Sequence, residues 1–244
     1  TMDLMNLKDI TPDQVVFVQW RFVTINATIV FTWLVMALLV GGSWLITRRF
    51  GAEARVSRWQ NLVEVTVDGM RRQIREISQQ DSRSHLVFVG SLFLFILTCN
   101  LLQVFPGYVA PTASLSTTAA LAICVFIAVP MYGIASRGVG GFFKQYLQPT
   151  WLMLPFNILG ELSRTLALAV RLFGNIMSGT KVAAILLSLA PLFFPIVMHA
   201  LGLLTGVIQA YIFSVLAMVY IASATRAQAE RREAQPDDAA PPKP

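Results

Sequence analysis

The stretch LALAVRLFGN at residues 166–175 decides the fold of this chain, because it sets one charge inside an apolar run. The charge is Arg171, and a guanidinium stays protonated in proteins. At the centre of a bilayer an arginine costs roughly 2.5–3.5 kcal/mol on insertion scales, so such residues normally face a protein interior, a carboxylate or water. The rest of the sequence has to show which of these Arg171 faces.

The composition is that of a membrane protein. The 244 residues are 55% hydrophobic and only 13% charged, with a mean hydropathy of +0.62, whereas soluble domains carry about 25% charged residues. A spanning helix needs about 20 mostly apolar residues. Uncharged gaps longer than that separate Arg21 from Arg48, Arg83 from Arg137, and Lys181 from Arg226.

We therefore expect an all-α membrane protein with about five membrane-embedded helices and one amphipathic surface helix, in a single membrane domain over residues 1–226. The predicted spans are about 23–47, 85–105, 115–135, 150–190 and 196–225. The surface helix is predicted at about 56–79, where apolar residues recur at helical spacing between arginines and acids. Residues 1–20 are interpreted as a polar arm, and residues 227–244 as a disordered cytoplasmic tail.

The distribution of basic residues predicts the orientation, since short cytoplasmic loops are enriched in lysine and arginine. Segment 48–83 carries eight arginines and the loop 105–114 carries no charge. This places the N-terminus outside and the C-terminus in the cytoplasm. The net charge of +6 is explained by contact with anionic lipid and calls for no nucleic acid. With no transit peptide visible, we expect a bacterial inner membrane.

The segment 150–190 is too long for an ordinary span. About 35 helical residues make a rod of about 50 Å, longer than the hydrocarbon is thick, so we expect the last two helices to be strongly tilted or nearly horizontal. Polar side chains form a row on one face of this segment. Its members are Asn157, Glu161, Arg164, Arg171, Asn175 and Ser178.

Arg171 lacks an evident carboxylate partner within this chain. Glu161 lies ten residues away, about 15 Å along a straight helix, and Arg164 is its better neighbour. The alternatives are that Arg171 reaches a lipid headgroup or pairs with Glu161. We favour a counter-charge on another subunit.

The last predicted span also carries polar residues. Gln209 and Thr205 share a face, and a buried glutamine must find hydrogen-bond partners; it is either interhelical glue or part of a polar pathway. His199 is either an interface anchor or the lining of an aqueous entry. Lys181 is expected to reach outer headgroups or water. Cys99 and Cys124 are interpreted as buried packing thiols.

Four sequence motifs together resemble those of subunit a of the rotary F-type ATP synthase, and the resemblance covers about residues 15–226. The most specific is RLFGN at 171–175, joined to IQAYIFSVLAMVYI at 208–221. The weaker ones are APTASLSTTAALA at 110–122 and GVGGFFKQYLQPTWLMLPFNILGELSRTLALA at 138–169.

The resemblance implies an ion-translocating subunit that forms two offset half-channels against a ring of c subunits. Arg171 would face the ring carboxylate, keep it ionised and block a leak. Asn175 and Gln209 would line the outer half-channel or position the arginine, and the further half-channel candidates are Asn157, Glu161, Arg164, Ser178, His199 and Thr205. The implied partners are the c ring, b-type peripheral stalk subunits, the rest of the complex and the bilayer. The resemblance implies no catalytic residue, metal or cofactor in this chain, because the ATP chemistry belongs to the catalytic head.

The sequence departs from the family in the outer half-channel. Ser114 replaces a common aspartate, and Gly202 replaces a histidine of some relatives. Fewer titratable groups leave H⁺ and Na⁺ both open as the coupling ion. The alternative function is a secondary transporter with a midplane solute site, against which stands the lack of an inverted repeat. A non-conducting scaffold and an enzyme explain Arg171 less well.

Overall fold

The computed structural model describes residues 16–20, 23–48, 65, 68–73, 75–76, 83–105, 108–147, 152–189 and 194–226. Five long helices make up most of them, so the predicted all-helical membrane architecture is confirmed. They are α1 (Ala27–Arg48), α3 (Arg83–Leu101), α4 (Leu115–Leu147), α5 (Met153–Leu189) and α6 (Phe194–Arg226). Two short 3-10 turns, η2 (Leu102–Val104) and η3 (Pro111–Ala113), lie between α3 and α4.

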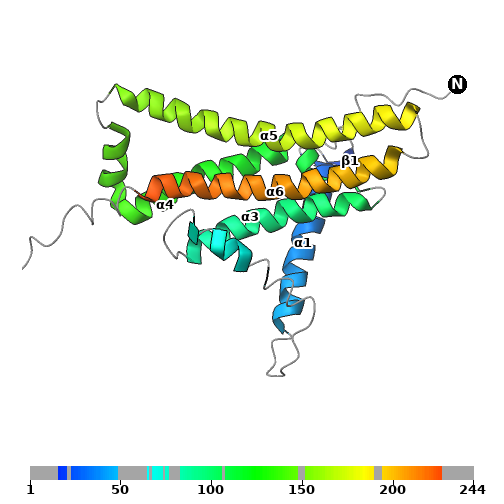
Figure 1. Ribbon diagram of the computed structural model, residues 1–244, viewed down its shortest axis with the longest axis horizontal. Helices are drawn as coiled ribbons and strands as arrows, with labels where there is room; N and C mark the ends of the chain where they lie inside the picture. The colour runs from blue at the N-terminus through cyan, green and yellow to red at the C-terminus, as the bar shows by residue number, and fades with distance from the viewer. Residues whose placement is uncertain are drawn as a thin grey trace, which may run out of the picture.

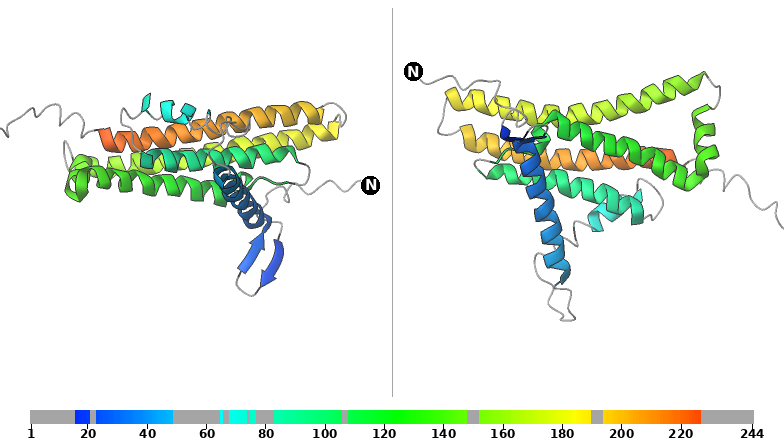
Figure 2. Two further views of the ribbon diagram at one scale, coloured as in Figure 1. Left: turned by 90° about the horizontal axis from the view of Figure 1, so that it is seen from below. Right: turned by 180° about the vertical axis from the view of Figure 1, so that it is seen from behind.

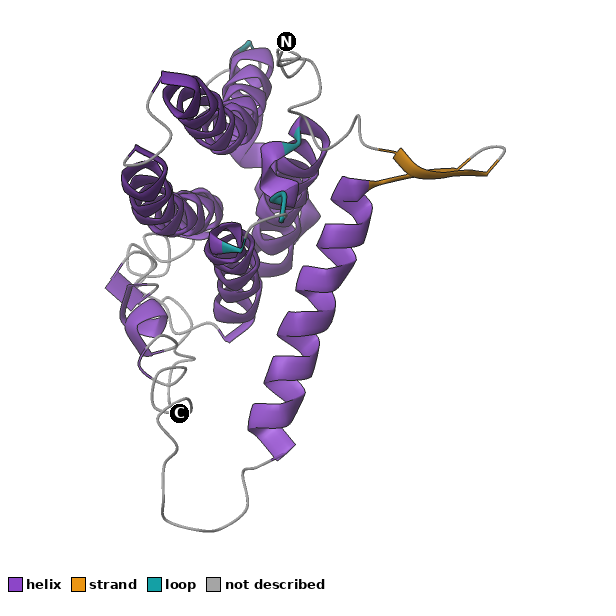
Figure 3. Ribbon diagram, turned by 90° about the vertical axis from the view of Figure 1, so that its right-hand side faces the viewer, coloured by secondary structure: helices purple, strands orange, loops and turns teal. Residues whose placement is uncertain are grey.

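The helices α3 to α6 run along a common direction, and α1 crosses them steeply (Figures 1 and 3). The long helices α5 and α6 lie side by side and antiparallel (Figure 1). Helix α6 packs against α3, α4 and α5, and α4 packs against α5, whereas α1 meets the bundle mainly through α3. The last two helices thus form one face of a helical bundle.

The core lies where α3, α4, α5 and α6 meet. Buried residues on α6 recur every three or four positions, the spacing of one helix face. The largest fully buried apolar side chains of this core are Ile96, Leu168, Leu172, Phe213, Met218 and Ile221. This packing fixes which sides of α5 and α6 turn away from the bundle.

Four of the five long helices are apolar and long enough to cross a membrane. The candidate spans are Ala27–Leu45, His85–Val104, Leu115–Ser136 and Ile196–Thr225. Helix α5 is not among them, and it carries more charged side chains than any of the other four, namely Glu161, Arg164, Arg171 and Lys181. The chain is a multi-pass membrane protein, and a fifth membrane-embedded helix stays a prediction.

A short antiparallel hairpin precedes α1 and is a departure from the prediction. Strand β1 (Val16–Trp20) pairs with β2 (Val23–Asn26), and the hairpin projects from the start of α1 (Figure 2). Residues 23–26 were expected in the first span, and 16–20 in a polar arm. Both strands are rich in β-branched or aromatic residues, which favour extended backbone.

Helix α4 is longer than the predicted span 115–135. It continues to Leu147, with a break at Gly138, whose φ of 72° lies in the left-handed region. Glycine adopts that conformation without the steric cost that a Cβ brings. The chain therefore turns at Gly138 and continues as helix through much of the segment between the predicted spans 115–135 and 150–190.

The cysteine prediction holds for one residue of the two. Cys99 is fully buried in the core, but Cys124 is exposed, because it lies on the outer side of α4. Of the predicted surface helix, the described residues 65, 68–73 and 75–76 are helical. The rest of that helix, the arm before Val16 and the tail 227–244 lie outside the described residues.

Candidate functional site

The polar row of α5 lies at the edge of the bundle, beside the side of the helix that packs into the core. Arg164, Arg171 and Ser178 are exposed, and Asn157, Glu161 and Asn175 are half-buried. The neighbouring side of the helix, about a quarter turn round from the row, is buried in the bundle through residues such as Leu168, Leu172 and Ile176. The same helix thus anchors the bundle with one side and presents a charged row with the other.

Glu161 and Arg164 form an ion pair, as predicted from their spacing. Arg164 Nη1 lies 3.7 Å from Glu161 Oε2, and the arginine side chain is 53% exposed against 15% for the glutamate. Thr165 Oγ1 donates to the Glu161 carbonyl at 3.0 Å on the same turn. Glu161 is the only acidic residue in the sequence between Asp81 and Glu230, and it is paired with Arg164.

Arg171 is exposed and makes no ion pair or hydrogen bond within the part of the chain that the structure describes. The core residue Leu172 beside it is fully buried, so the backbone at this point is fixed by packing while the Arg171 side chain is exposed. The alternative of an internal pair with Glu161 finds no support, because Glu161 pairs with Arg164.

A contact between α5 and α6 sets their register. The Cζ atom of Arg164 lies 5.7 Å from the ring centroid of Tyr220, within the range of a cation–π interaction. The helices are antiparallel (Figure 1), and each rises 1.5 Å per residue. Eleven residues onward from Arg164 is Asn175 (164 + 11 = 175), and eleven back from Tyr220 is Gln209 (220 − 11 = 209). Asn175 and Gln209 therefore lie at about the same level of the bundle.

Gln209 is buried, with 5% of its surface exposed. Its amide nitrogen Nε2 has no hydrogen-bond partner among the described residues, although a buried donor without a partner costs about 1–3 kcal/mol. Gln209 is thus a buried polar group with spare donor capacity at the level of Asn175. Water or an ion-binding group would satisfy it.

A buried polar cluster that the sequence analysis missed ties α3 to α6 beside Gln209. Asn100 Nδ2 donates to the Gly206 carbonyl at 2.8 Å, and Thr112 Oγ1 donates to Asn100 Oδ1 at 3.4 Å. Asn100 and Thr112 are 1% and 0% exposed. A Cβ at Gly206 would lie 2.8 Å from the Asn100 Cβ, so this approach requires glycine. The signals available in the sequence were an asparagine inside an apolar span and a glycine one turn before Gln209.

The remaining candidates of α6 are on its outer side. His199 and Thr205 are exposed, and Thr205 Oγ1 donates to the carbonyls of Leu201 and Gly202, at 3.0 and 3.1 Å. Thr205 and the buried Gln209 therefore face different surroundings although they are one turn apart. On α5, Ser178 Oγ donates to the Asn175 carbonyl at 3.1 Å, and Lys181 is exposed.

A second residue that the sequence analysis missed is His85, at the start of α3. It is 6% exposed and packs edge to face on Tyr132, with ring centroids 4.7 Å apart. Its Nδ1 atom has no partner among the described residues. His85 belongs to the contact between α3 and α4 and lies outside the polar row.

Sequence comparison with known proteins covers most of the chain. The sequence profile of the family described as "ATP synthase A chain" matches residues 29–222. The chain is 61% identical over 217 residues to "ATP synthase subunit a 2" of Acaryochloris marina, covering 89% of this chain and 93% of the relative. It is 61% identical over 223 residues to the protein of the same name in Picosynechococcus sp. (91% and 96%), and 57% identical over 224 residues to "ATP synthase subunit a" of Albidiferax ferrireducens (92% and 97%). The chain belongs to the family of ATP synthase subunit a, the ion-translocating stator subunit of that complex.

Proposed function

We propose that Arg171 is the charge that faces the rotating c ring and that ions pass to and from the ring on either side of it. The observation that carries this proposal is the exposed guanidinium of Arg171, which has no carboxylate partner among the described residues. A charge that is unpaired within its own chain and lies on an apolar helix needs a partner from outside. The resemblance to the family supplies one, the ion-binding carboxylate of a c subunit.

The chemistry of the proposed contact is electrostatic. A positive charge within a few ångströms lowers the pKa of a carboxylate, so the ring site loses its ion as it reaches Arg171. The guanidinium itself does not deprotonate, so no proton passes through this position. Arg171 thus separates an entry path from an exit path.

The two half-channels are assigned to opposite ends of the polar row. Asn175, Gln209, Ser178, Thr205 and His199 belong to the outer half-channel. Asn157, Glu161 and Arg164 belong to the cytoplasmic one. From Arg171, Asn157 is about 21 Å away along the helix and Ser178 about 10 Å, so the two paths are offset along the interface.

The length of α5 supports a strongly tilted or nearly horizontal position in the membrane. Its 37 residues measure about 55 Å, against about 30 Å of hydrocarbon. Helix α1 crosses the bundle steeply (Figure 3). This fits an α1 that spans the membrane while α5 and α6 lie nearly parallel to the membrane plane. We assign the N-terminus to the outside and the C-terminus to the cytoplasm of a bacterial inner membrane.

The partners that we propose are the c ring, b-type peripheral stalk subunits and the rest of the ATP synthase, with H⁺ or Na⁺ as the coupling ion. The chain itself carries out no ATP chemistry in this proposal. Sodium dependence of the ATPase activity of the assembled complex distinguishes the two ions. Activity that is independent of Na⁺ assigns H⁺.

Replacing Arg171 by alanine in the whole complex tests the proposal. In inverted membrane vesicles Arg171→Ala should abolish ATP-driven ion uptake and ATP synthesis, while the c ring still co-purifies with the chain. Lys181→Ala is the matched control, since it removes an exposed cation of the same helix and should leave coupling in place. Normal coupled rates in Arg171→Ala would show that the arginine has no such role.

A further inference from the structure

A cavity of about 280 Å³ lies between α3, α6 and the arginine-rich segment, by which we mean the described helical residues 65, 68–73 and 75–76. The buried side chains of Val89 on α3 and Met218 on α6 form part of its wall. Met70 holds the segment close to α3, since a Cβ at Gly90 would lie 3.7 Å from the Met70 sulfur. The cavity is separate from the polar row of α5.

The residues that line the cavity are all neutral, although arginines lie close to them in the sequence. On a helix that turns about 100° per residue, Gly69, Met70 and Gln73 lie on one side of the segment. The exposed Arg71 lies about half a turn round from that side. A charged ligand in the cavity would therefore lose its hydration without gaining a counter-charge, which is costly. The wall favours a neutral ligand.

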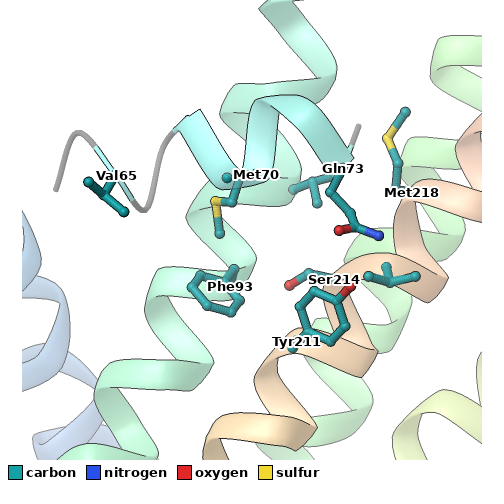
Figure 4. Close-up of a pocket in the computed structure, with 10 residues that line it drawn as sticks. Val65, Met70, Gln73, Phe93, Tyr211, Ser214 and Met218 are labelled. Carbon is teal, nitrogen blue, oxygen red and sulfur yellow. The ribbon is translucent and has the colours of Figure 1, made fainter. Parts of the chain in front are cut away.

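The volume and the wall together limit the size and shape of that ligand. An engineered apolar cavity of about 150 Å³ binds one benzene molecule. A cavity of about 280 Å³ is nearly twice as large, so it holds a substituted benzene of roughly ten to twelve non-hydrogen atoms. Methionine sulfurs and aromatic side chains both make favourable contacts with an aromatic ring. The wall supplies four such side chains, which are Met70, Phe93, Tyr211 and Met218 (Figure 4).

Two polar side chains of the wall have hydrogen-bonding capacity to spare. The Gln73 side chain extends from the segment towards α6 (Figure 4) and makes no hydrogen bond among the described residues. Ser214 Oγ donates to the Ala210 carbonyl at 2.9 Å, which leaves its lone pairs free to accept. An amide both donates and accepts, so a ligand hydroxyl can accept from Gln73 and donate to Gln73 or Ser214.

We propose that this cavity binds a small neutral phenol, by which we mean a benzene ring that carries one hydroxyl and one short apolar group. The ring lies between the side chains of Met70, Phe93 and Met218, and the hydroxyl pairs with Gln73 and Ser214. The ligand would join the arginine-rich segment to α6, where Ser214 lies five residues after Gln209. The proposal stands independently of the role of Arg171.

The test measures binding of para-(trifluoromethyl)phenol to the full chain in phosphatidylcholine nanodiscs by fluorine NMR. We expect a bound resonance, distinct from that of the probe dissolved in lipid, which saturates and is displaced by para-tert-butylphenol. With affinities expressed relative to the probe concentration in the lipid, (trifluoromethyl)benzene should bind about fivefold more weakly, the equivalent of about 1 kcal/mol for one hydrogen bond. Uptake of the phenol into the lipid alone would overturn the proposal, as would equal affinity of the two probes.

Two substitutions in the wall test whether the probe lies in this cavity. Gly69 lines the cavity and a side chain there meets open space, so Gly69→Leu should reduce the affinity for the phenol at least about fivefold. The matched control is Gly41→Leu on α1, which also enters open space and lies outside the cavity. Gln73→Leu keeps the volume of the wall and removes the amide, so it should weaken the phenol about fivefold and leave (trifluoromethyl)benzene unchanged. Unchanged phenol binding in either wall variant would overturn the proposal.

Discussion

The two longest antiparallel helices of the last part of the chain handle their polar residues in opposite ways. Helix α5 leaves the side chains of Arg164 and Arg171 exposed at the edge of the bundle, whereas α6 buries its central polar residue, Gln209. A neutral amide can be buried at a cost of a few kcal/mol, but an unpaired guanidinium costs far more. The guanidinium therefore lies at the surface of the bundle, and the amide lies within it.

We expect the largest effect from replacing Arg171 of α5 by a cation that can lose its proton. Lysine keeps the charge in water, but it loses its proton when it is desolvated. We expect Arg171→Lys to reduce ATP-driven ion uptake in inverted vesicles by more than about tenfold, the equivalent of about 1.4 kcal/mol. Lys181→Arg is the control and should be neutral. Full activity in Arg171→Lys would mean that any cation suffices at this position.

The buried packing of α6 against α3 can be disrupted by a substitution at Gly206. A methyl group there would meet Asn100 Cβ at 2.8 Å, and overpacking of this kind costs about 1–3 kcal/mol. Gly206→Ala should therefore lower the thermal unfolding temperature of the purified chain in detergent. Gly202→Ala, one turn earlier on α6, enters open space and should leave stability unchanged or raise it by up to about 1 kcal/mol through helix propensity. Equal behaviour of the two variants would contradict the close approach of α3 and α6.

The hydrogen bonds of Asn100 can be tested separately from packing. Asn100→Ala leaves the Gly206 carbonyl without its side-chain donor and the Thr112 hydroxyl without its acceptor, so we expect a loss of about 1–3 kcal/mol. Thr112→Val removes the weaker, 3.4 Å bond and should cost less. If the two act as one cluster, the double variant should be less destabilised than the sum of the singles. Simple additivity in unfolding measurements would show that the two bonds are independent.

The register contact should give the smallest effect. The Arg164 side chain is half-exposed over the ring of Tyr220, and a cation–π contact at such a site contributes about 0.5–1 kcal/mol. Tyr220→Leu should reduce stability by about that amount, and Tyr220→Phe, which keeps the ring, should not. An equal loss of stability in Tyr220→Phe would assign the effect to the hydroxyl.

A disulfide between cysteines introduced at Asn175 and Gln209 would report the register of α5 and α6 directly. Sliding one helix by one residue displaces the two positions by about 1.5 Å along the helix axis.

Much of the architecture around α5 and α6 could be predicted from the sequence, because the first helix has prolines at its two ends and Arg226 ends the second, which leaves little choice of boundary. The prolines are Pro149, Pro155, Pro191 and Pro195. The predicted helices 150–190 and 196–225 match α5 and α6 to within a few residues. The Glu161–Arg164 ion pair could also be predicted, because residues three apart are neighbours on a helix surface. These are local properties of a helix.

The rest depends on contacts between distant residues or on local backbone choices that hydropathy does not encode. The partnership of Asn100 with Gly206 spans 106 residues, and no spacing rule connects them. The hairpin before α1 was missed because its β-branched residues are apolar and merge with the following span. Gly138 lies outside both predicted spans, although the chain resumes helix directly after it. Cys124 is apolar in its sequence context, yet it lies on an outer face.

The ion pair of Glu161 and Arg164 shapes the potential that an anion would meet along α5. At a distance the pair acts as a dipole, whose attraction fades faster than that of a single charge. Lys181 lies about 15 Å beyond Arg171 along the helix, and Coulomb attraction falls with distance. The electrostatic energy of an anion moved along this face therefore has one deep minimum, at Arg171. On one side the Glu161–Arg164 pair attracts the anion only weakly, and on the other side Lys181 is about 15 Å away. A rotor that carries carboxylates would have one favoured position for each carboxylate that passes Arg171. Evenly spaced carboxylates would therefore divide a full rotation into equal steps.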